Sequence, residues 1–175
     1  MISASVPRRV GLQVGVSAAA RPAAIAALFG AQAIHVRAMI DHAPSWPAAG
    51  AFFLLLAVAE GSAAAWLLLA PSRRAAHAAI VLSFVTMAVW AVSRTTGLPV
   101  GPHPWLAEPI AAPDGISTAL EMLTAIALVA WLRPVDSAAS PPVARRWWAG
   151  VAIASVAAIT YLGLVLPAHS VSTLH

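Results

Sequence analysis

The pattern of apolar positions divides the chain into five long segments separated by short polar or proline-containing stretches. The apolar segments cover about residues 22–40, 46–70, 75–96, 116–132 and 147–166. Each is close to the roughly 20 residues that an α-helix needs to cross the hydrocarbon core of a bilayer. The pattern therefore predicts an all-α integral membrane bundle of five transmembrane helices. Residues 22–167 form the predicted membrane domain, between a tail at 1–21 and a tail at 168–175.

The distribution of arginine predicts how this bundle is oriented. Arginines lie before the first segment, between the second and third, and between the fourth and fifth: Arg8, Arg9, Arg21, Arg73, Arg74, Arg133, Arg145 and Arg146. The loops on the opposite side carry no arginine. Because cytoplasmic loops are enriched in basic residues, we expect a cytoplasmic N-terminus and an external C-terminus.

Composition supports a membrane location and argues against a soluble protein. Hydrophobic residues make up 61% of the chain and charged residues 9%, and mean hydropathy is +0.84. Soluble domains carry about 25% charged residues. The net charge of +4 comes from scattered arginines rather than from one basic surface, so nucleic acid is not an expected partner. Arginine without lysine and abundant alanine indicate a bacterial cytoplasmic (inner) membrane. The expected partners are the lipid bilayer and either another membrane protein or a second copy.

A few polar side chains fall inside the predicted spans, where ionisable groups are functional candidates. At about 1.5 Å per residue, His35, Glu121 and Tyr161 lie roughly 8–9 Å below the outer face. Arg94 lies near the outer end of its segment and can reach inward. These four residues are predicted to share one polar layer, with a rim formed by Asp41, His42, His103, Glu108 and Asp114.

This layer has two interpretations. In the first, His35, His42, His103 and Glu121 hold a metal, because imidazole and carboxylate suit divalent transition metals; a proton is the alternative ligand. In the second, Arg94 and Glu121 form a structural ion pair that fixes helix packing. No pair of His or Glu residues three or four apart favours the metal interpretation.

Glu60 is treated separately, as a buried polar residue like Tyr161. It lies roughly 20 Å below the outer face, which is too deep to reach His35 if both helices are straight. Thr86 and Ser62 are its expected hydrogen-bond partners. Glu60 is then either a neutral, hydrogen-bonded carboxyl or a step in a proton path.

The sequence contains no recognisable catalytic motif. There is no cysteine, and nucleophile elbows, H-E-x-x-H helices and phosphate-binding loops are also missing. We therefore assign no catalytic residue and regard an enzyme as the less favoured class.

Residues Trp90 to Pro102 read W-A-V-S-R-T-T-G-L-P-V-G-P, and they precede Glu108, Asp114 and Glu121. This stretch resembles uncharacterised multi-pass membrane proteins of actinobacteria, which share a W-x-x-S-R-T-x-G-L-P-x-G-P pattern. The segment from His42 to Phe53 is similar as well, so the likeness extends over about three quarters of the chain. The resemblance implies architecture and no particular activity.

The glycines and prolines of this stretch predict a turned loop that is either a cap over the bundle or a plain connector. We expect a small membrane protein with an outward-facing polar pocket that binds a metal cation or a proton. The alternative is a structural or assembly subunit of a larger membrane complex. A redox enzyme or a transporter is less favoured, because five helices are few for a complete transporter.

Overall fold

The computed structural model describes the backbone of residues 8–133 and 142–166, and the side chains of 19–133 and 146–166. Those ranges contain five α-helices and no strand: α1 (Arg8–His42), α2 (Pro47–Leu69), α3 (Arg73–Thr95), α4 (Ala112–Leu132) and α5 (Pro142–Val165). All five are long and apolar enough to cross a membrane. The predicted all-helical, five-span architecture is confirmed.

The helix bounds differ from the predicted segments mainly at the start of α1. That helix begins at Arg8 and continues through Pro22, whereas residues 1–21 were expected to form a tail. The part apolar enough to span a membrane begins only at Ala19. Hydropathy locates the membrane-crossing part of a helix and not the residue at which the helix begins. The expected tail at 168–175 lies outside the described residues.

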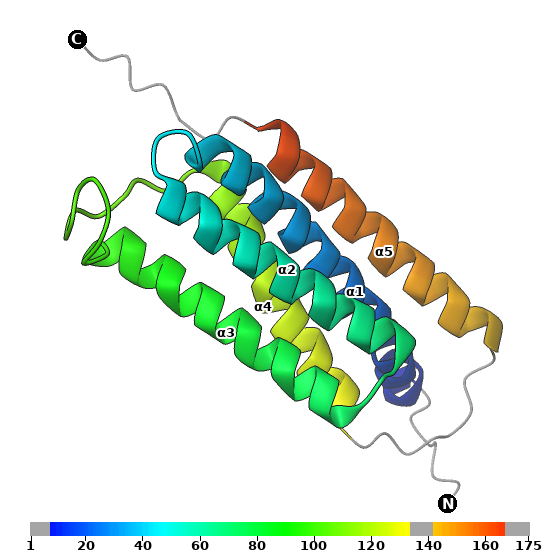
Figure 1. The fold of residues 1–175 in the computed structure, drawn as a ribbon. Helices are drawn as coiled ribbons and strands as arrows, with labels where there is room; N and C mark the ends of the chain where they lie inside the picture. The colour runs from blue at the N-terminus through cyan, green and yellow to red at the C-terminus, as the bar shows by residue number, and fades with distance from the viewer. Residues whose placement is uncertain (1–7, 134–141, 167–175) are drawn as a thin grey trace, which may run out of the picture.

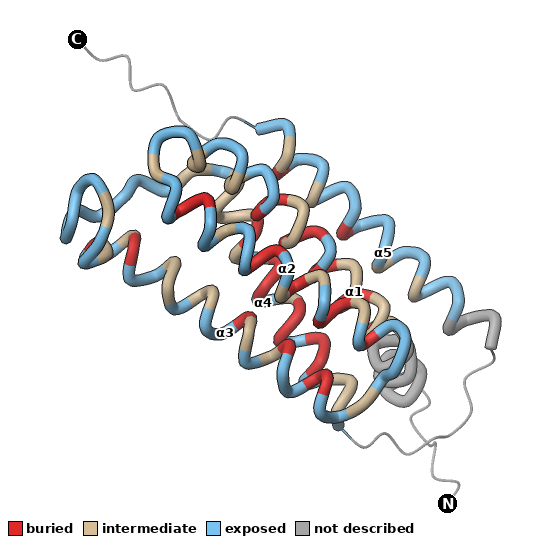
Figure 2. Tube along the Cα trace, in the orientation of Figure 1, coloured by how far each residue is buried: buried red, intermediate tan, exposed pale blue. Residues whose placement is uncertain are grey.

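The five helices run side by side, with α1 at the centre (Figure 1). α1 packs against α2, α4 and α5, and α3 packs against α4 and α2. Buried residues lie on the faces that the helices turn toward one another, and the outward faces are exposed (Figure 2). Many of these exposed residues are large and apolar, among them Leu55, Leu69, Ile126 and Leu162. Such a surface suits lipid, so the chain is a multi-pass membrane protein.

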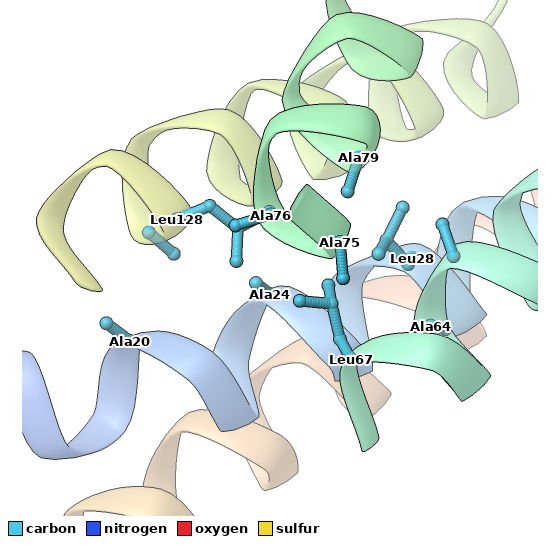
Figure 3. Packing of buried hydrophobic residues seen from close by; sticks show 11 residues of the cluster. Ala20, Ala24, Leu28, Ala64, Leu67, Ala75, Ala76, Ala79 and Leu128 are labelled. Carbon is cyan, nitrogen blue, oxygen red and sulfur yellow. The ribbon is translucent and has the colours of Figure 1, made fainter. Parts of the chain in front are cut away.

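One end of the bundle is closed by tightly packed small apolar side chains. Ala24 and Leu28 of α1 meet Leu67 of α2, Ala76 of α3 and Leu128 of α4, and each of these five has no accessible surface (Figure 3). Alanine lets the helix backbones approach closely. We call this region, centred on Ala20, Ala24, Leu28, Ala64, Leu67, Ala75, Ala76, Ala79 and Leu128, the apolar plug.

The opposite end carries the short corner 43–46 between α1 and α2 and the longer loop 96–111 between α3 and α4, and we call it the loop end. The long loop folds back on α3, since the Glu108 N–H donates to the Ser93 carbonyl over 3.0 Å. Gly97 adopts φ 73°, and a Cβ there would lie 2.5 Å from the backbone nitrogen of Leu106. Glycine is required at that position because both the conformation and the close approach exclude a side chain. The loop is a folded cap rather than a plain connector.

Candidate functional site

Three polar side chains meet in the interior of the bundle, between the loop end and the apolar plug. His35 comes from α1, Glu60 from α2 and Glu121 from α4, and one ligand atom from each lies within 4.8 Å of the other two. His35 is 5% exposed, and both glutamates are fully buried. We call these three residues the acid–histidine cluster.

His35 and Glu60 are in direct contact. The His35 Nδ1 lies 2.8 Å from Oε1 of Glu60, and the two side chains share a hydrogen bond of 2.9 Å between Nδ1 and Oε2. The expectation that Glu60 lies too deep to reach His35 was therefore wrong. Side chains on a helix lean toward its N-terminus. Because α1 and α2 are antiparallel, His35 leans toward the plug while Glu60 leans toward the loop end, and the two meet.

Thr86 and Ser62, the expected hydrogen-bond partners of Glu60, do not bond to it. The Thr86 hydroxyl donates instead to the Leu82 carbonyl over 3.1 Å. Ser62 is exposed on the outside of α2.

Glu121 is the least satisfied member of the cluster. Neither of its carboxylate oxygens makes a hydrogen bond of good geometry, although the buried Ser83 hydroxyl and the Glu60 carboxyl lie beside it. Buried polar atoms are nearly always hydrogen-bonded, so an unsatisfied group indicates a missing ligand or a stored cost. One imidazole nitrogen and two carboxylates are a suitable donor set for a divalent transition metal. Nitrogen and oxygen ligands of one tetrahedral zinc ion lie roughly 3.3 Å apart, so these three ligand atoms would have to approach one another by at most about 1.5 Å to share an ion.

Arg94 does not pair with Glu121, so the expected structural ion pair was wrong. The Arg94 guanidinium lies 2.8 Å from Glu108 and 2.7 Å from Asp114, and it also donates to the Pro109 carbonyl over 2.9 Å. Glu121 follows Asp114 by seven residues, or about 10 Å along α4. Arg94 therefore pairs with acidic residues at its own depth in the bundle. These pairs connect the cap to the ends of α3 and α4.

The other predicted site residues lie outside the cluster. The His42 ring contacts Phe53, with ring centroids 5.1 Å apart, and its Nδ1 donates to the Ala38 carbonyl over 2.8 Å. His103 is exposed on the cap. Neither residue joins His35 and Glu121 among the described residues that could share a metal, so the predicted four-residue ligand set was wrong in these two members.

Tyr161 was expected to be a buried polar residue, but its side chain is 65% exposed. α5 packs through its small positions instead: Gly163 lies against Ile34 and Ile116, and Thr160 lies against Gly30. Tyr161 occupies the neighbouring face of α5, which is turned to the outside.

A cavity of about 570 Å³ connects the cluster with the loop end. His35 lies on its lining, whereas Glu60 and Glu121 do not. The wall also includes Arg94 and four of the five predicted rim residues, Asp41, His42, Glu108 and Asp114, whereas His103 does not line it. On the other side of the cluster lies the apolar plug. Within the described residues, the cluster is therefore approached from the loop end.

Three contributors to this site were missed at the sequence level. Glu60 was excluded by a depth argument that ignored the lean of side chains along antiparallel helices. Phe53 stacks on the His35 ring, with centroids 5.9 Å apart and an angle of 18° between the planes, and Trp90 lines the cavity. Both lie within the stretches that carry the resemblance, but aromatic residues in an apolar span have no pattern that distinguishes a site from helix packing.

Comparisons with protein-family models, with curated proteins and with solved structures gave no match to this chain. The resemblance to actinobacterial membrane proteins therefore stays a prediction.

Proposed function

We propose that this chain is a small protein of the bacterial cytoplasmic membrane that binds a divalent transition-metal cation at His35, Glu60 and Glu121. The observation that carries the proposal is the buried Glu121 carboxyl, which makes no hydrogen bond of good geometry and lies beside two other ligand groups. An uncompensated ionised carboxylate in a membrane interior costs several kcal/mol. The two carboxylates, when ionised, carry the negative charge that one divalent cation balances, and the neutral imidazole adds a ligand without adding charge.

The approach to the site fits a bound cation better than a transported one. The cavity and His35 lie on the loop-end side, and the apolar plug closes the other side. The arginine distribution puts the loop end outside the cell. A cation would then enter from the exterior, be held by the three side chains and leave by the same route.

The direct test is metal analysis of the purified protein. The protein would be purified without chelators and without a polyhistidine tag, and its terminal histidines, His169 and His175, would be replaced in every variant to remove weak tail binding. Mass spectrometry of the elements should find about one zinc, iron, copper or nickel ion per chain, and Glu121→Gln should reduce this to a small fraction. Glu108→Gln is the matched control, because Glu108 is an acidic cavity residue outside the cluster.

Two results would overturn the proposal. One is the absence of transition metal from the wild-type protein even after zinc is added and excess ion removed. The other is equal loss of metal in Glu108→Gln and Glu121→Gln. The first result, together with proton uptake that disappears in Glu121→Gln, would assign the cluster to a shared proton instead.

A further inference from the structure

A buried hydroxyl lies beside the acid–histidine cluster, on a helix that supplies none of its three members. Ser83 belongs to α3 and has no accessible surface. Its hydroxyl lies next to the Glu121 carboxyl of α4, and α3 and α4 pack against each other. Ser83 is not part of the cavity lining. The hydroxyl is therefore enclosed together with the buried glutamates.

Ser83 differs from the other serines and threonines of α3 and α4 in what its hydroxyl contacts. Each of the others donates a hydrogen bond to a carbonyl of its own helix: Thr86, Ser93, Thr95, Ser117, Thr118 and Thr124. The Ser83 hydroxyl makes no hydrogen bond of good geometry. Bonding back to the helix is the ordinary way for such residues to satisfy their hydroxyls in a helix. Ser83 instead keeps its donor for a group on another element.

The buried face of α3 does not need a polar residue for packing at this position. Ala79 lies one turn before Ser83 on the same face and is also fully buried. Alanine would pack there without a polar atom, whereas a buried hydroxyl that lacks a partner is costly. Buried polar atoms are nearly always hydrogen-bonded. The hydroxyl at residue 83 therefore indicates a partner that the neighbouring cluster supplies.

Glu121 is the member of the cluster that requires a donor. The Glu60 carboxyl already shares a hydrogen bond with His35. If Glu121 binds a cation through one oxygen, its other oxygen stays buried, and carboxylates that ligate metals are usually hydrogen-bonded in turn. Thr124, which lies one turn away on α4, donates to the Leu120 carbonyl. Of these two neighbouring hydroxyls, that of Ser83 is the one free to donate.

From these observations we infer that Ser83 is a positioning residue of the cation site, an inference that rests on the proposed function. When the cation is bound, one Glu121 oxygen coordinates it and the other accepts a hydrogen bond from the Ser83 hydroxyl. Ser83 is not itself a ligand, because zinc takes thiolate, imidazole and carboxylate groups rather than neutral hydroxyls. The charge-assisted bond holds the carboxylate in one orientation and stabilises its negative charge.

The test compares the zinc affinity of the wild-type protein with that of Ser83→Ala. Both would be purified in detergent with the terminal histidines replaced, and the Kd for zinc would be measured by competition with a chelating dye. Loss of such an outer partner lowers metal affinity by about 10- to 100-fold, so the Kd should rise by this factor. Ser93→Ala is the matched control. It removes the same atom from another buried serine of α3, whose hydroxyl bonds to its own helix, and it should leave the Kd unchanged.

Infrared spectroscopy adds a measurement that a purely structural serine would not affect. Difference spectra between the zinc-loaded and chelated wild-type protein should contain carboxylate bands that are missing from Glu121→Gln. In Ser83→Ala at saturating zinc, these bands should shift, because the bound carboxylate has lost its donor. Ser93→Ala should reproduce the wild-type bands. Circular dichroism in chelator would show that each variant is folded before zinc is added.

An unchanged zinc Kd in Ser83→Ala would overturn the inference and leave the cation site intact, as would carboxylate bands that do not shift. Equal losses of affinity in Ser83→Ala and Ser93→Ala would also overturn it, because they would indicate disturbed packing of α3. If the wild-type protein binds no zinc, the proposed function fails and the role of Ser83 fails with it. Glu121→Gln should lose more zinc than Ser83→Ala, since it removes a ligand rather than the donor that orients one.

Discussion

Replacing Glu121 with methionine should stabilise the metal-free protein and abolish its response to metal. The side chain is fully buried, and neither carboxylate oxygen makes a hydrogen bond of good geometry. Leaving a buried polar group unsatisfied costs about 1–3 kcal/mol. Methionine has a similar length, adapts its shape to the space and carries no such group. In the presence of chelator we therefore expect Glu121→Met to gain about 1–3 kcal/mol.

The gain converts to a measurable shift in thermal unfolding. For a chain of this size, 1 kcal/mol moves the midpoint by roughly 2–4 °C, so the chelated variant should unfold about 2–12 °C above wild type. Excess zinc should reverse the order. A cation at about 1,000 times its Kd stabilises the wild-type fold by about 4.1 kcal/mol, which exceeds the largest expected advantage of the variant, and the variant, which lacks one ligand, should gain far less.

The assay is unfolding in detergent, followed by circular dichroism at a single scan rate, because irreversible unfolding makes midpoints depend on rate. Leu120→Met is the matched control. It changes a neighbouring buried residue, should cost less than about 1.5 kcal/mol, and should leave the zinc response intact. The reasoning is refuted if chelated Glu121→Met unfolds below wild type, because the carboxyl would then be contributing stability of its own.

The remaining predictions concern the cap and the orientation of the bundle. Arg94→Lys should make the cap more sensitive to limited proteolysis, because lysine cannot reproduce the forked contacts of the guanidinium. Unchanged cleavage would show that these contacts do not hold the cap in place. Gly97→Ala should lower the unfolding midpoint by several degrees, since the backbone there has φ 73° and no room for a Cβ, whereas Gly115→Ala, with no atom within 4 Å of the added Cβ, should not. In this cysteine-free chain, His103→Cys should react with an impermeant maleimide in intact cells, and Pro71→Cys only after permeabilisation; the reverse labelling would invert the predicted orientation.

The fold could be predicted from the sequence because lipid leaves few alternatives. Backbone groups in hydrocarbon must be satisfied within a helix, so segment length and hydropathy almost determine the elements. The start of α1 could not be predicted this way. Residues 8–18 belong to this helix although they contain two glycines and three valines, which are weak helix formers.

The candidate site could be predicted only in part. His35 and Glu121 were identified because ionisable groups in a span are costly. Glu60 was placed too deep, since counting residues along separate helices ignores the direction in which side chains lean. The choice among Glu108, Asp114 and Glu121 as partners of Arg94 depended on how the cap folds, and no local pattern in a glycine- and proline-rich loop determines that.

The apolar plug also has an electrical consequence. A membrane potential falls across the part of a protein that excludes water and ions, and moving one elementary charge through all of it changes the energy by about 2.3 kcal/mol per 100 mV. Here the cavity opens toward the loop end, while alanine and leucine fill the other half of the bundle. An ion that reaches His35 from the loop end has therefore crossed only part of the voltage drop, so depolarisation should change its occupancy less than it would change that of an ion crossing the whole bundle.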